Sequence, residues 1–434
     1  MKRTLCLTFA LLLLLPLFAA AEEELTAQAV FELIQNGDYS SVYALFDPAM
    51  QKALPEIALQ GIFEDLETAL GRTAGCGEEK TVSYAPYRIT TLPLNYEKAG
   101  VNLQVTWEGN KIAGLFYTIL PSETPQETPE GILEESVQVG EMGLAGLLTL
   151  PSECSHPLPA AVLVHGSGPN DRDETIGNTK LFRDLAHLMA QAGIASVRYD
   201  KRTYAAKVRE GEMAGFTVKE ESIDDAVAAA QLLRADPRID PDRVYLIGHS
   251  LGAMIAPRIA KENPGLFAGI VLLSGTPKTL GDIVLSQNQA LVQNMEPWEK
   301  LVGETQLAGL RLSWKKVLES TAEEAQKQTV FGQPAYYFWE MAQYDTAQMM
   351  KEAGVPALIM NGGADFQVAD ADGIDAWRAL ELPENVRLCY YPDLNHLLMN
   401  PQAPDSMRGA VKEYDIPCHV SEDAAEEITA FILK

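Results

Sequence analysis

Short apolar runs alternate with helix-like segments over the last two thirds of the chain, and this alternation predicts a mainly parallel β-sheet with helices on both faces. Each run has the length and the β-branched content of a buried strand, at residues 143–150, 160–166, 194–200, 243–248, 269–275, 356–362 and 386–392. Helical periodicity lies between and after the runs, most clearly at residues 179–193, 222–236 and 421–434. The pattern therefore predicts an α/β fold.

One long interval interrupts this rhythm. From about residue 276 to residue 352 the sequence holds helix-like segments and no convincing strand. An insertion of this length between two strands predicts a helical cap over the sheet. Its aromatic residues include Trp298, Trp314 and the run AYYFWEM at residues 335–341. They are predicted to form the core of the cap, because large apolar side chains at helical spacing usually pack together, and contact with the substrate is the alternative.

The first part of the chain is organised differently. Residues 25–120 begin with helical patterning and end with alternating, strand-like runs at residues 101–107 and 112–120, which predicts a small α+β domain. Residues 121–132 are rich in Pro, Thr and Glu and lack apolar periodicity, so they are predicted to be an exposed linker. The α/β domain is then expected to occupy residues 133–434.

The N-terminal stretch, residues 1–21, has the pattern of a secretory signal peptide. Lys2 and Arg3 precede an apolar run, and small residues at 19–21 precede an acidic segment that begins at Glu22. A membrane anchor is the alternative, but the run is shorter than the ~20 residues that span a bilayer. We therefore expect cleavage after residue 21, a secreted or periplasmic location, and no membrane insertion after cleavage.

Composition and charge narrow the class of partner. The chain is 47% hydrophobic and 22% charged, as in soluble globular proteins, and its formal net charge is −26. Such a charge repels nucleic acid and anionic membranes, so neither is an expected partner. The sequence lacks the H-E-x-x-H metal motif, the phosphate-binding P-loop and a dinucleotide-binding glycine motif after a strand. Oligomeric state stays open.

The stretch LIGHSLG, at residues 246–252, predicts a nucleophile. An apolar strand leads into it and the helix-like segment 251–260 follows it, with Ser250 between Gly248 and Gly252. In a nucleophile elbow the serine occupies a sharp strand-to-helix turn, and the flanking positions are glycine because no side chain fits where strand and helix nearly touch. The motif in this context predicts that Ser250 attacks a carbonyl group.

A serine hydroxyl needs a base, and in α/β-hydrolases the chain order is serine, then carboxylate, then histidine. Only His396 and His419 follow Ser250. His396 comes just after the last apolar run, on a loop that leaves the sheet, so we predict that it is the base. His419 precedes the final helix and is predicted to be an ordinary surface residue.

The carboxylate that orients the base is expected on the loop after the preceding strand. Asp365 follows the glycine turn at the end of residues 356–362 and is the first choice, whereas Asp370 and Asp372 lie further along. Asp393 is close to His396 but follows a proline, which favours a turn role. The predicted catalytic residues are therefore Ser250, Asp365 and His396.

The oxyanion that forms during attack requires two hydrogen-bond donors. We predict the backbone N–H of Leu251, directly after the nucleophile, and that of Ser167 in the HGSG loop at residues 165–168, with Gly166 as the alternative. His165 and His249 are interpreted as structural or pocket-wall residues.

Charged loops lie at the same end of the predicted sheet, at residues 168–174 and 198–202. Their side chains are expected to pair with one another and to brace the oxyanion loop. The alternative is that Arg172 or Arg202 binds a carboxylate of the substrate.

With these residues assembled, residues 133–434 resemble the serine α/β-hydrolase superfamily. The stretches HGSGPNDRDE, RYDKR and GHSLGAMIAPRIA are similar to exported bacterial hydrolases of the dienelactone hydrolase and acyl-CoA thioesterase (bile-acid acyltransferase C-terminal) branches. Residues 25–120 resemble the N-terminal domain of unknown function called DUF3887. The resemblance implies an eight-stranded, mostly parallel sheet and acyl-enzyme chemistry, although dienelactone hydrolases carry cysteine at the position of Ser250.

The sequence thus predicts an exported serine hydrolase of carboxylic esters, with a small-molecule ester as its substrate, that needs no cofactor and no metal. One alternative is a serine peptidase or aminopeptidase of the prolyl-oligopeptidase type, which shares the elbow. The other is a non-catalytic envelope-binding protein on the same scaffold, since fold alone does not fix function.

Overall fold

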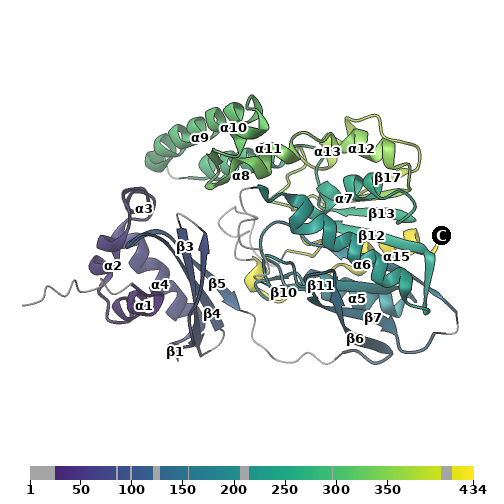
Figure 1. Ribbon diagram of the computed structural model, residues 1–434, viewed down its shortest axis with the longest axis horizontal. Coiled ribbons are helices and arrows are strands. Elements are labelled where there is room, and N and C mark those ends of the chain that lie inside the picture. Colours follow the sequence, from purple (N-terminus) through teal and green to yellow (C-terminus); the bar gives the residue numbers. More distant parts are fainter. Residues whose placement is uncertain are drawn as a thin grey trace, which may run out of the picture. The chain divides into compact units, whose positions relative to one another are not determined.

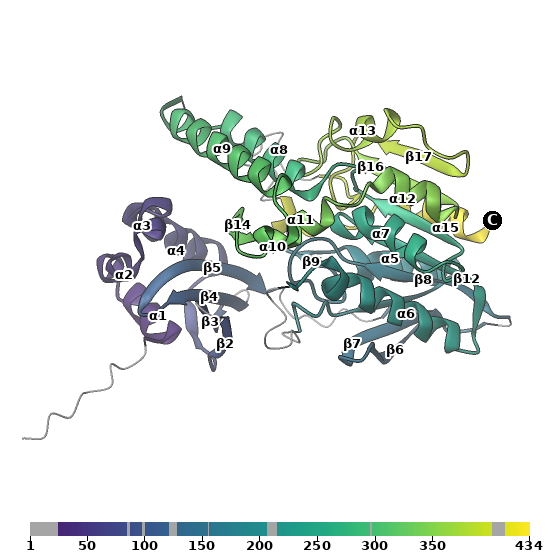
Figure 2. The same ribbon diagram turned by 45° about the horizontal axis from the view of Figure 1, so that its top comes forward.

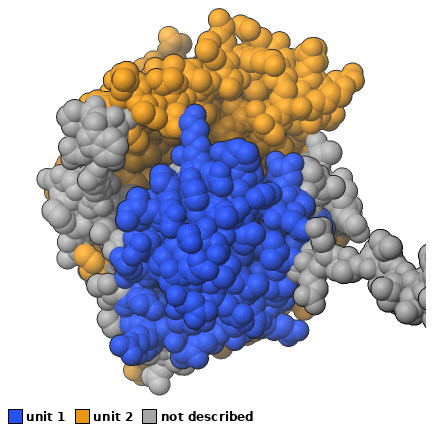
Figure 3. Space-filling model, turned by 90° about the vertical axis from the view of Figure 1, so that its left-hand side faces the viewer, with its two compact units in different colours: residues 1–122 blue, residues 123–434 orange. Residues whose placement is uncertain are grey.

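The computed structural model describes residues 25–84, 87–97, 100–120, 128–154, 156–205, 215–295, 297–401 and 413–434. The chain divides into two compact units, residues 1–122 and 123–434, which Figure 3 colours separately. The predicted signal peptide and residues 121–127 of the predicted linker lie outside the described residues.

The first unit combines helices with an antiparallel sheet. Its helices are α1 (Ala27–Gln35), α2 (Tyr39–Leu45), α3 (Pro48–Ala53) and α4 (Glu56–Leu70). Thr26, Asp38 and Asp47 cap the first three helices, because each side chain accepts a hydrogen bond from a backbone N–H of the first turn.

The sheet of this unit has five strands, β1 (Thr73–Cys76), β2 (Lys80–Tyr84), β3 (Tyr87–Tyr96), β4 (Gly100–Glu108) and β5 (Lys111–Leu120). Strands β4 and β5 coincide with the two alternating runs of the sequence. The other three are additional, since β1 and β2 are too short for a clear period and Pro93 interrupts the pattern of β3. Alternate residues of β3 and β4 face α1 and α4 in an apolar core around Trp107.

The second unit is built on one eight-stranded sheet in the order β17-β16-β13-β12-β8-β11-β7-β6. Its strands are β6 (Ile132–Val139), β7 (Leu144–Pro151), β8 (Leu158–Val164), β11 (Ala195–Tyr199), β12 (Ile239–His249), β13 (Gly269–Leu273), β16 (Ala357–Gly362) and β17 (Val386–Tyr391). Neighbouring strands pair in parallel from β11 to β17, whereas β6 and β7 pair antiparallel. This mostly parallel sheet confirms the predicted fold class.

Helices cover both faces of this sheet (Figure 1). One apolar layer contains residues of α6 (Asp224–Ala235), α7 (Leu251–Glu262) and α13 (Ile374–Arg378), and the other contains residues of α5 (Leu181–Gln191) and α15 (Glu422–Leu433). Successive residues of β8 alternate between the layers, with Val162 and Val164 in the first and Ala161 and Leu163 in the second. A strand buried on both faces has no polar side, which explains the continuous apolar runs in the sequence.

The predicted cap interval contains the helices α8 (Leu280–Gln293), α9 (Pro297–Leu318), α10 (Ala322–Ala325), α11 (Ala335–Met341) and α12 (Thr346–Ala353). Figure 2 shows α8 and α9 side by side, and Trp314 and Phe338 lie in a small apolar core among these helices. The interval also holds a two-stranded hairpin of β14 (Thr329–Val330) and β15 (Gln333–Pro334), which the sequence did not predict. Two-residue strands are too short to show a period.

None of the described helices is long and apolar enough to cross a membrane.

Candidate active site

Ser250 occupies a sharp turn between β12 and α7. Its backbone lies at φ +52° and ψ −112°, a conformation that is unusual for a residue with a side chain. A Cβ atom at Gly248 would overlap the backbone of Gly252, and one at Gly252 would overlap the carbonyl oxygen of Val164 in β8. The glycines are therefore required by close packing, and the strained serine is held by its neighbours, with its N–H donating to the Leu273 carbonyl at 2.9 Å.

His396 and Asp365 form a buried pair on loops that follow β17 and β16. The Nδ1 atom of His396 lies 2.7 Å from Oδ2 of Asp365. Asp365 also accepts hydrogen bonds at 2.8 Å from the backbone N–H groups of Gln367 and Val368. Because a carboxylate accepts hydrogen bonds, Nδ1 is the donor to Asp365, and Nε2 is the ring nitrogen left to act on the hydroxyl of Ser250.

A cavity of about 210 Å³ brings the predicted residues together, because Ser167, Ser250, Leu251 and His396 all line it. It opens at the carboxyl ends of the central strands. The predicted nucleophile, the base and both predicted oxyanion residues therefore share one space, while Asp365 lies behind His396.

The rival residues are engaged elsewhere. Asp370 accepts a hydrogen bond from Tyr390, and Asp372 forms an ion pair with Lys278 at 2.5 Å. His419 contacts Asp184 at 2.9 Å, and its side chain is 65% exposed.

The backbone of the HGSG loop distinguishes between the two candidate oxyanion donors. The N–H of Gly166 donates to Oε1 of Glu174 at 2.6 Å, so this donor is already used. A Cβ atom at Gly166 would lie 3.2 Å from Cβ of Ser250, so the loop closely approaches the nucleophile. Leu251 begins α7, where the first N–H groups have no partner within the helix. This geometry favours Ser167 and Leu251 as the donors.

Glu174 and His249 form a second buried pair beside the nucleophile, one that sequence reasoning did not find. Nδ1 of His249 lies 3.0 Å from Oε1 of Glu174, and Nε2 lies 3.1 Å from the backbone carbonyl of His396. Since both ring nitrogens of His249 face acceptors, the ring is a doubly protonated cation. Glu174 has φ +48°, a second backbone outlier at this site.

The charged forms of Glu174 and His249 stabilise each other. Burial favours the neutral forms of both groups, but the attraction between them outweighs burial. As a result the pKa of Glu174 lies below its usual value and the pKa of His249 lies above its usual value. No spacing in the sequence connects two residues on separate loops, so the pair is visible only in the fold.

His165 has a structural environment. Burial lowers the pKa of His165 to about 4, so the ring is neutral, and it packs against Phe182 and Tyr199 with ring centroids 5.0 and 5.5 Å apart. Its Nε2 atom lies 3.0 Å from the backbone carbonyl of Asp171.

The arginines of the charged loops pair with carboxylates. Arg172 contacts both carboxylate oxygens of Asp200 at 2.9 Å, and Arg202 contacts both oxygens of Asp225 on α6 at 2.9 and 2.7 Å. Arg172 therefore joins the two charged loops, as bracing requires, whereas Arg202 ties its loop to α6. Neither arginine lines the cavity around Ser250, so neither is placed to bind a substrate carboxylate there.

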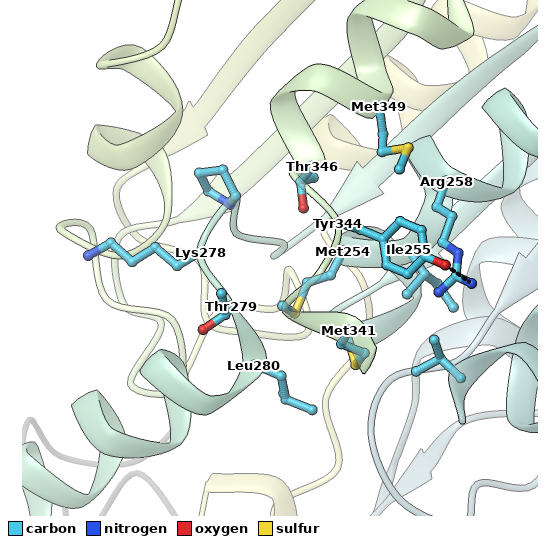
Figure 4. A pocket seen from close by; sticks show the side chains of 12 residues that line it. Met254, Ile255, Arg258, Lys278, Thr279, Leu280, Met341, Tyr344, Thr346 and Met349 are labelled. Atoms are coloured by element: carbon cyan, nitrogen blue, oxygen red, sulfur yellow. Dashed lines mark hydrogen bonds between the residues drawn. The ribbon is translucent and has the colours of Figure 1, made fainter. Parts of the chain in front are cut away.

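A second, smaller cavity of about 30 Å³ lies next to the first (Figure 4). The two share Met254 and Leu280 as wall residues. Met341 and Met349 also line the small cavity, and at another part of its wall the Arg258 guanidinium lies 3.7 Å from the centre of the Tyr344 ring. Because methionine side chains are flexible, the wall between the cavities can adapt.

Comparison with known proteins agrees with this site. A family model described as "Serine aminopeptidase, S33" matches residues 159–402. The chain belongs to this serine hydrolase family. Residues 27–115 match a "Protein of unknown function (DUF3887)" family, which confirms the resemblance of the N-terminal domain.

The serine hydrolase is 30% identical over 426 residues to "Esterase EstD" of Thermotoga maritima, an alignment that covers 96% of each protein. Among solved structures it is similar to an esterase from Pyrococcus furiosus, with 13% identity, a TM-score of 0.42 and coverage of 72% of this chain and 96% of that one. A proline iminopeptidase from Mycobacterium smegmatis is similar at 13% identity, with a TM-score of 0.43 and coverage of 69% and 98%.

Proposed function

We propose that this serine hydrolase is an exported enzyme that cleaves small carboxylic esters through an acyl-enzyme on Ser250. The observation that carries the proposal is the cavity that Ser250 and His396 both line, with Asp365 hydrogen-bonded to Nδ1 of His396. The name of the relative EstD, an esterase, supports the ester as the bond that is cleaved.

The reaction proceeds in two halves. Nε2 of His396 takes the proton of Ser250 as Oγ bonds to the acyl carbon, and the carbonyl electron pair moves to oxygen, which the N–H groups of Leu251 and Ser167 stabilise. The intermediate collapses, the C–O bond to the alcohol breaks, and the alcohol leaves with the proton from His396. Water then repeats the sequence on the acyl-enzyme and releases the acid.

The cavity supports a short acyl group. Its volume is about 210 Å³, compared with about 150 Å³ for an engineered cavity that binds benzene. The apolar part of its wall consists of Ile176, Leu251, Met254, Leu280, Ile283, Val284 and Val368. Acyl groups of about two to six carbons fit such a space with part of the alcohol.

The charges at the cavity favour an ester over a peptide with a free amino terminus. Aminopeptidase activity, which the description of the family suggests, requires an anionic group for the substrate ammonium. Glu174 is the one carboxylate among the lining residues that the structure describes, and the cation of His249 balances its charge. Peptide hydrolysis therefore ranks second.

The test is hydrolysis of p-nitrophenyl esters from acetate to decanoate by the mature protein, beside Ser250→Ala and with an aminoacyl anilide in the same plate. We expect turnover of the short esters, loss of that turnover in Ser250→Ala, and labelling of the wild type by a fluorophosphonate. Cleavage of the anilide alone would establish a peptidase. Absence of hydrolysis of every substrate, together with absence of fluorophosphonate labelling, would favour a binding protein on a hydrolase scaffold.

Export is part of the proposal and is supported by the charged, apolar and small-residue pattern of residues 1–21. The N-terminal sequence of the protein recovered from outside the cytoplasm should begin at Glu22. Recovery of the uncleaved chain with the cytoplasmic fraction would contradict export.

A further inference from the structure

Side chains hold the peptide groups on both sides of Gly166. Lys201, on the loop after β11, donates from Nζ to the Gly166 carbonyl at 2.9 Å. The side chain of Asn170 donates to the same oxygen at 3.2 Å, and Glu174 accepts from the N–H of Gly166. Both polar backbone atoms of Gly166 are therefore held by side chains.

Because the peptide group is planar and trans, holding the Gly166 carbonyl also fixes the direction of the Ser167 N–H. The C=O of one residue and the N–H of the next lie on opposite sides of the same planar group. When Lys201 holds the Gly166 carbonyl on one side, the N–H of Ser167 must point to the other, and Ser167 lines the cavity around Ser250. A cation on the carbonyl oxygen also polarises the peptide, which makes this N–H a stronger donor.

Lys201 is held in place by a buried series of side-chain contacts that extends to helix α11 of the cap. Its side chain is 2% exposed, and Nζ also forms an ion pair with Oε1 of Glu221 at 2.8 Å. The other oxygen of Glu221 accepts a hydrogen bond from the hydroxyl of Tyr337 on α11. Glu221 belongs to a π-helical turn, η2 (Lys219–Ile223), a form that is frequent at functional sites.

We propose that Lys201 is a positioning residue of the oxyanion hole, which orients and polarises the N–H of Ser167, and that Glu221 and Tyr337 couple this donor to the cap. The inference rests on the proposed function, because it assigns a role in the same reaction. Lys201 touches neither the substrate nor the reacting atoms, so its effect is felt only when negative charge develops on the oxyanion.

A purely structural role for Lys201 makes different predictions. A buried ion pair that only stabilises the fold changes the free energy of unfolding without changing how the folded enzyme distinguishes a tetrahedral adduct from a ground-state ligand. The deciding quantity is therefore the affinity for a transition-state analogue relative to KM.

The principal variant is Lys201→Met combined with Glu221→Gln, which removes both charges and leaves no buried ion without a partner. The probe is 1,1,1-trifluorobutan-2-one. Its free ketone, which is in equilibrium with an unreactive hydrate, adds the serine oxygen reversibly, and the carbonyl electron pair becomes an anionic oxygen in the oxyanion hole. We expect kcat to fall about 10- to 100-fold, less than the 10²- to 10³-fold that follows loss of a whole oxyanion donor. The inhibition constant of the ketone should rise by a similar factor, while KM changes by less than about threefold.

Arg202→Met combined with Asp225→Asn is the matched control. Arg202 is the next residue in the chain and its ion pair with Asp225 is also buried, but Asp225 lies on α6 and neither side chain lines the cavity. This control should lose stability to a similar extent and keep the wild-type ratio of ketone affinity to KM.

Tyr337→Phe tests the link to the cap and keeps every charge. We expect a decrease of about two- to fivefold in kcat and in ketone affinity at unchanged KM, a result that also supports the proposal if the double variant does not fold. The proposal would be overturned if the folded double variant kept the wild-type ratio of ketone affinity to KM. If only Tyr337→Phe folds, an unchanged ratio in that variant would overturn it. Failure of the proposed function is a separate outcome, since the wild type itself would then neither hydrolyse esters nor react with the fluorophosphonate.

Discussion

We predict that Met254 limits how far the acyl chain of an ester can extend beyond the cavity around Ser250. It lies one turn after Ser250 on α7 and belongs to the wall between the cavities of about 210 and 30 Å³. Met254→Ala removes three heavy atoms from that wall, which makes room for about three more methylene groups. Each buried methylene contributes about 0.8 kcal/mol, or roughly a fourfold gain in kcat/KM.

Three methylenes correspond to about 2.4 kcal/mol, so the variant should hydrolyse the longest newly accepted ester roughly 50-fold better than the wild type. The same change opens a cavity and should destabilise the fold by about 2–4 kcal/mol. The assay is kcat/KM for p-nitrophenyl esters from acetate to decanoate, measured at a temperature where urea denaturation shows both proteins folded.

Met349→Ala is the matched control, because Met349 lines the small cavity without belonging to the shared wall. It enlarges the same space but leaves the partition in place, so its chain-length profile should remain that of the wild type. An unchanged profile in Met254→Ala, or an equal shift in both variants, would refute the reasoning.

Three further outcomes follow from the site. Asp365→Asn should reduce kcat by about 10³- to 10⁴-fold with little change in thermal stability, because the amide oxygen can still accept the two backbone N–H bonds while the orientation of the base is lost. The pKa of His249 is raised in the folded protein by its pair with Glu174. This pair therefore contributes fully to the free energy of unfolding below a pH of about 6.5, the pKa of an unperturbed histidine, and the contribution is lost as the pH rises through the raised pKa. Urea unfolding between pH 6 and 9.5 should show this decline for the wild type and not for His249→Asn. Gly252→Ala should prevent correct folding, because its Cβ overlaps the backbone of β8, whereas Gly309→Ala on exposed helix α9 has free space and should stabilise by about 0.5–1 kcal/mol in thermal denaturation.

The elements that could be predicted are those whose burial produces a recognisable pattern of apolar residues in the sequence. The buried strands of the second unit are continuous apolar runs because helices cover both faces of the sheet. The elbow could be recognised because the serine and both glycines lie within five residues, although Gly252 packs against Val164 of β8. Strand β6 lies at the edge of that sheet with mixed exposure, so its pattern is weaker. The hairpin of the cap and the strands β1 and β2 are too short to show a period.

The polar contacts around the site could not be predicted in the same way. Lys201 meets Gly166 across 35 residues of sequence, and His249 meets Glu174 across 75. Such contacts depend on which loops converge at the carboxyl edge of the sheet, which follows from strand order. The sequence did indicate that charged residues gather on two of these loops, but the partner of each residue is set by the tertiary structure.

A second histidine, His249, lies beside Ser250 and next to the proposed base, His396. The rings of His249 and His396 lie 4.8 Å apart, and both are close to the nucleophile. His249 cannot accept a proton, because its two nitrogens donate to Glu174 and to the backbone of His396. The same pair of hydrogen bonds fixes the backbone that carries the base and the carboxylate that binds the N–H of Gly166. One buried cation thus connects the base to the oxyanion loop, and this connection accounts for a charged pair in a position where two apolar side chains would pack equally well.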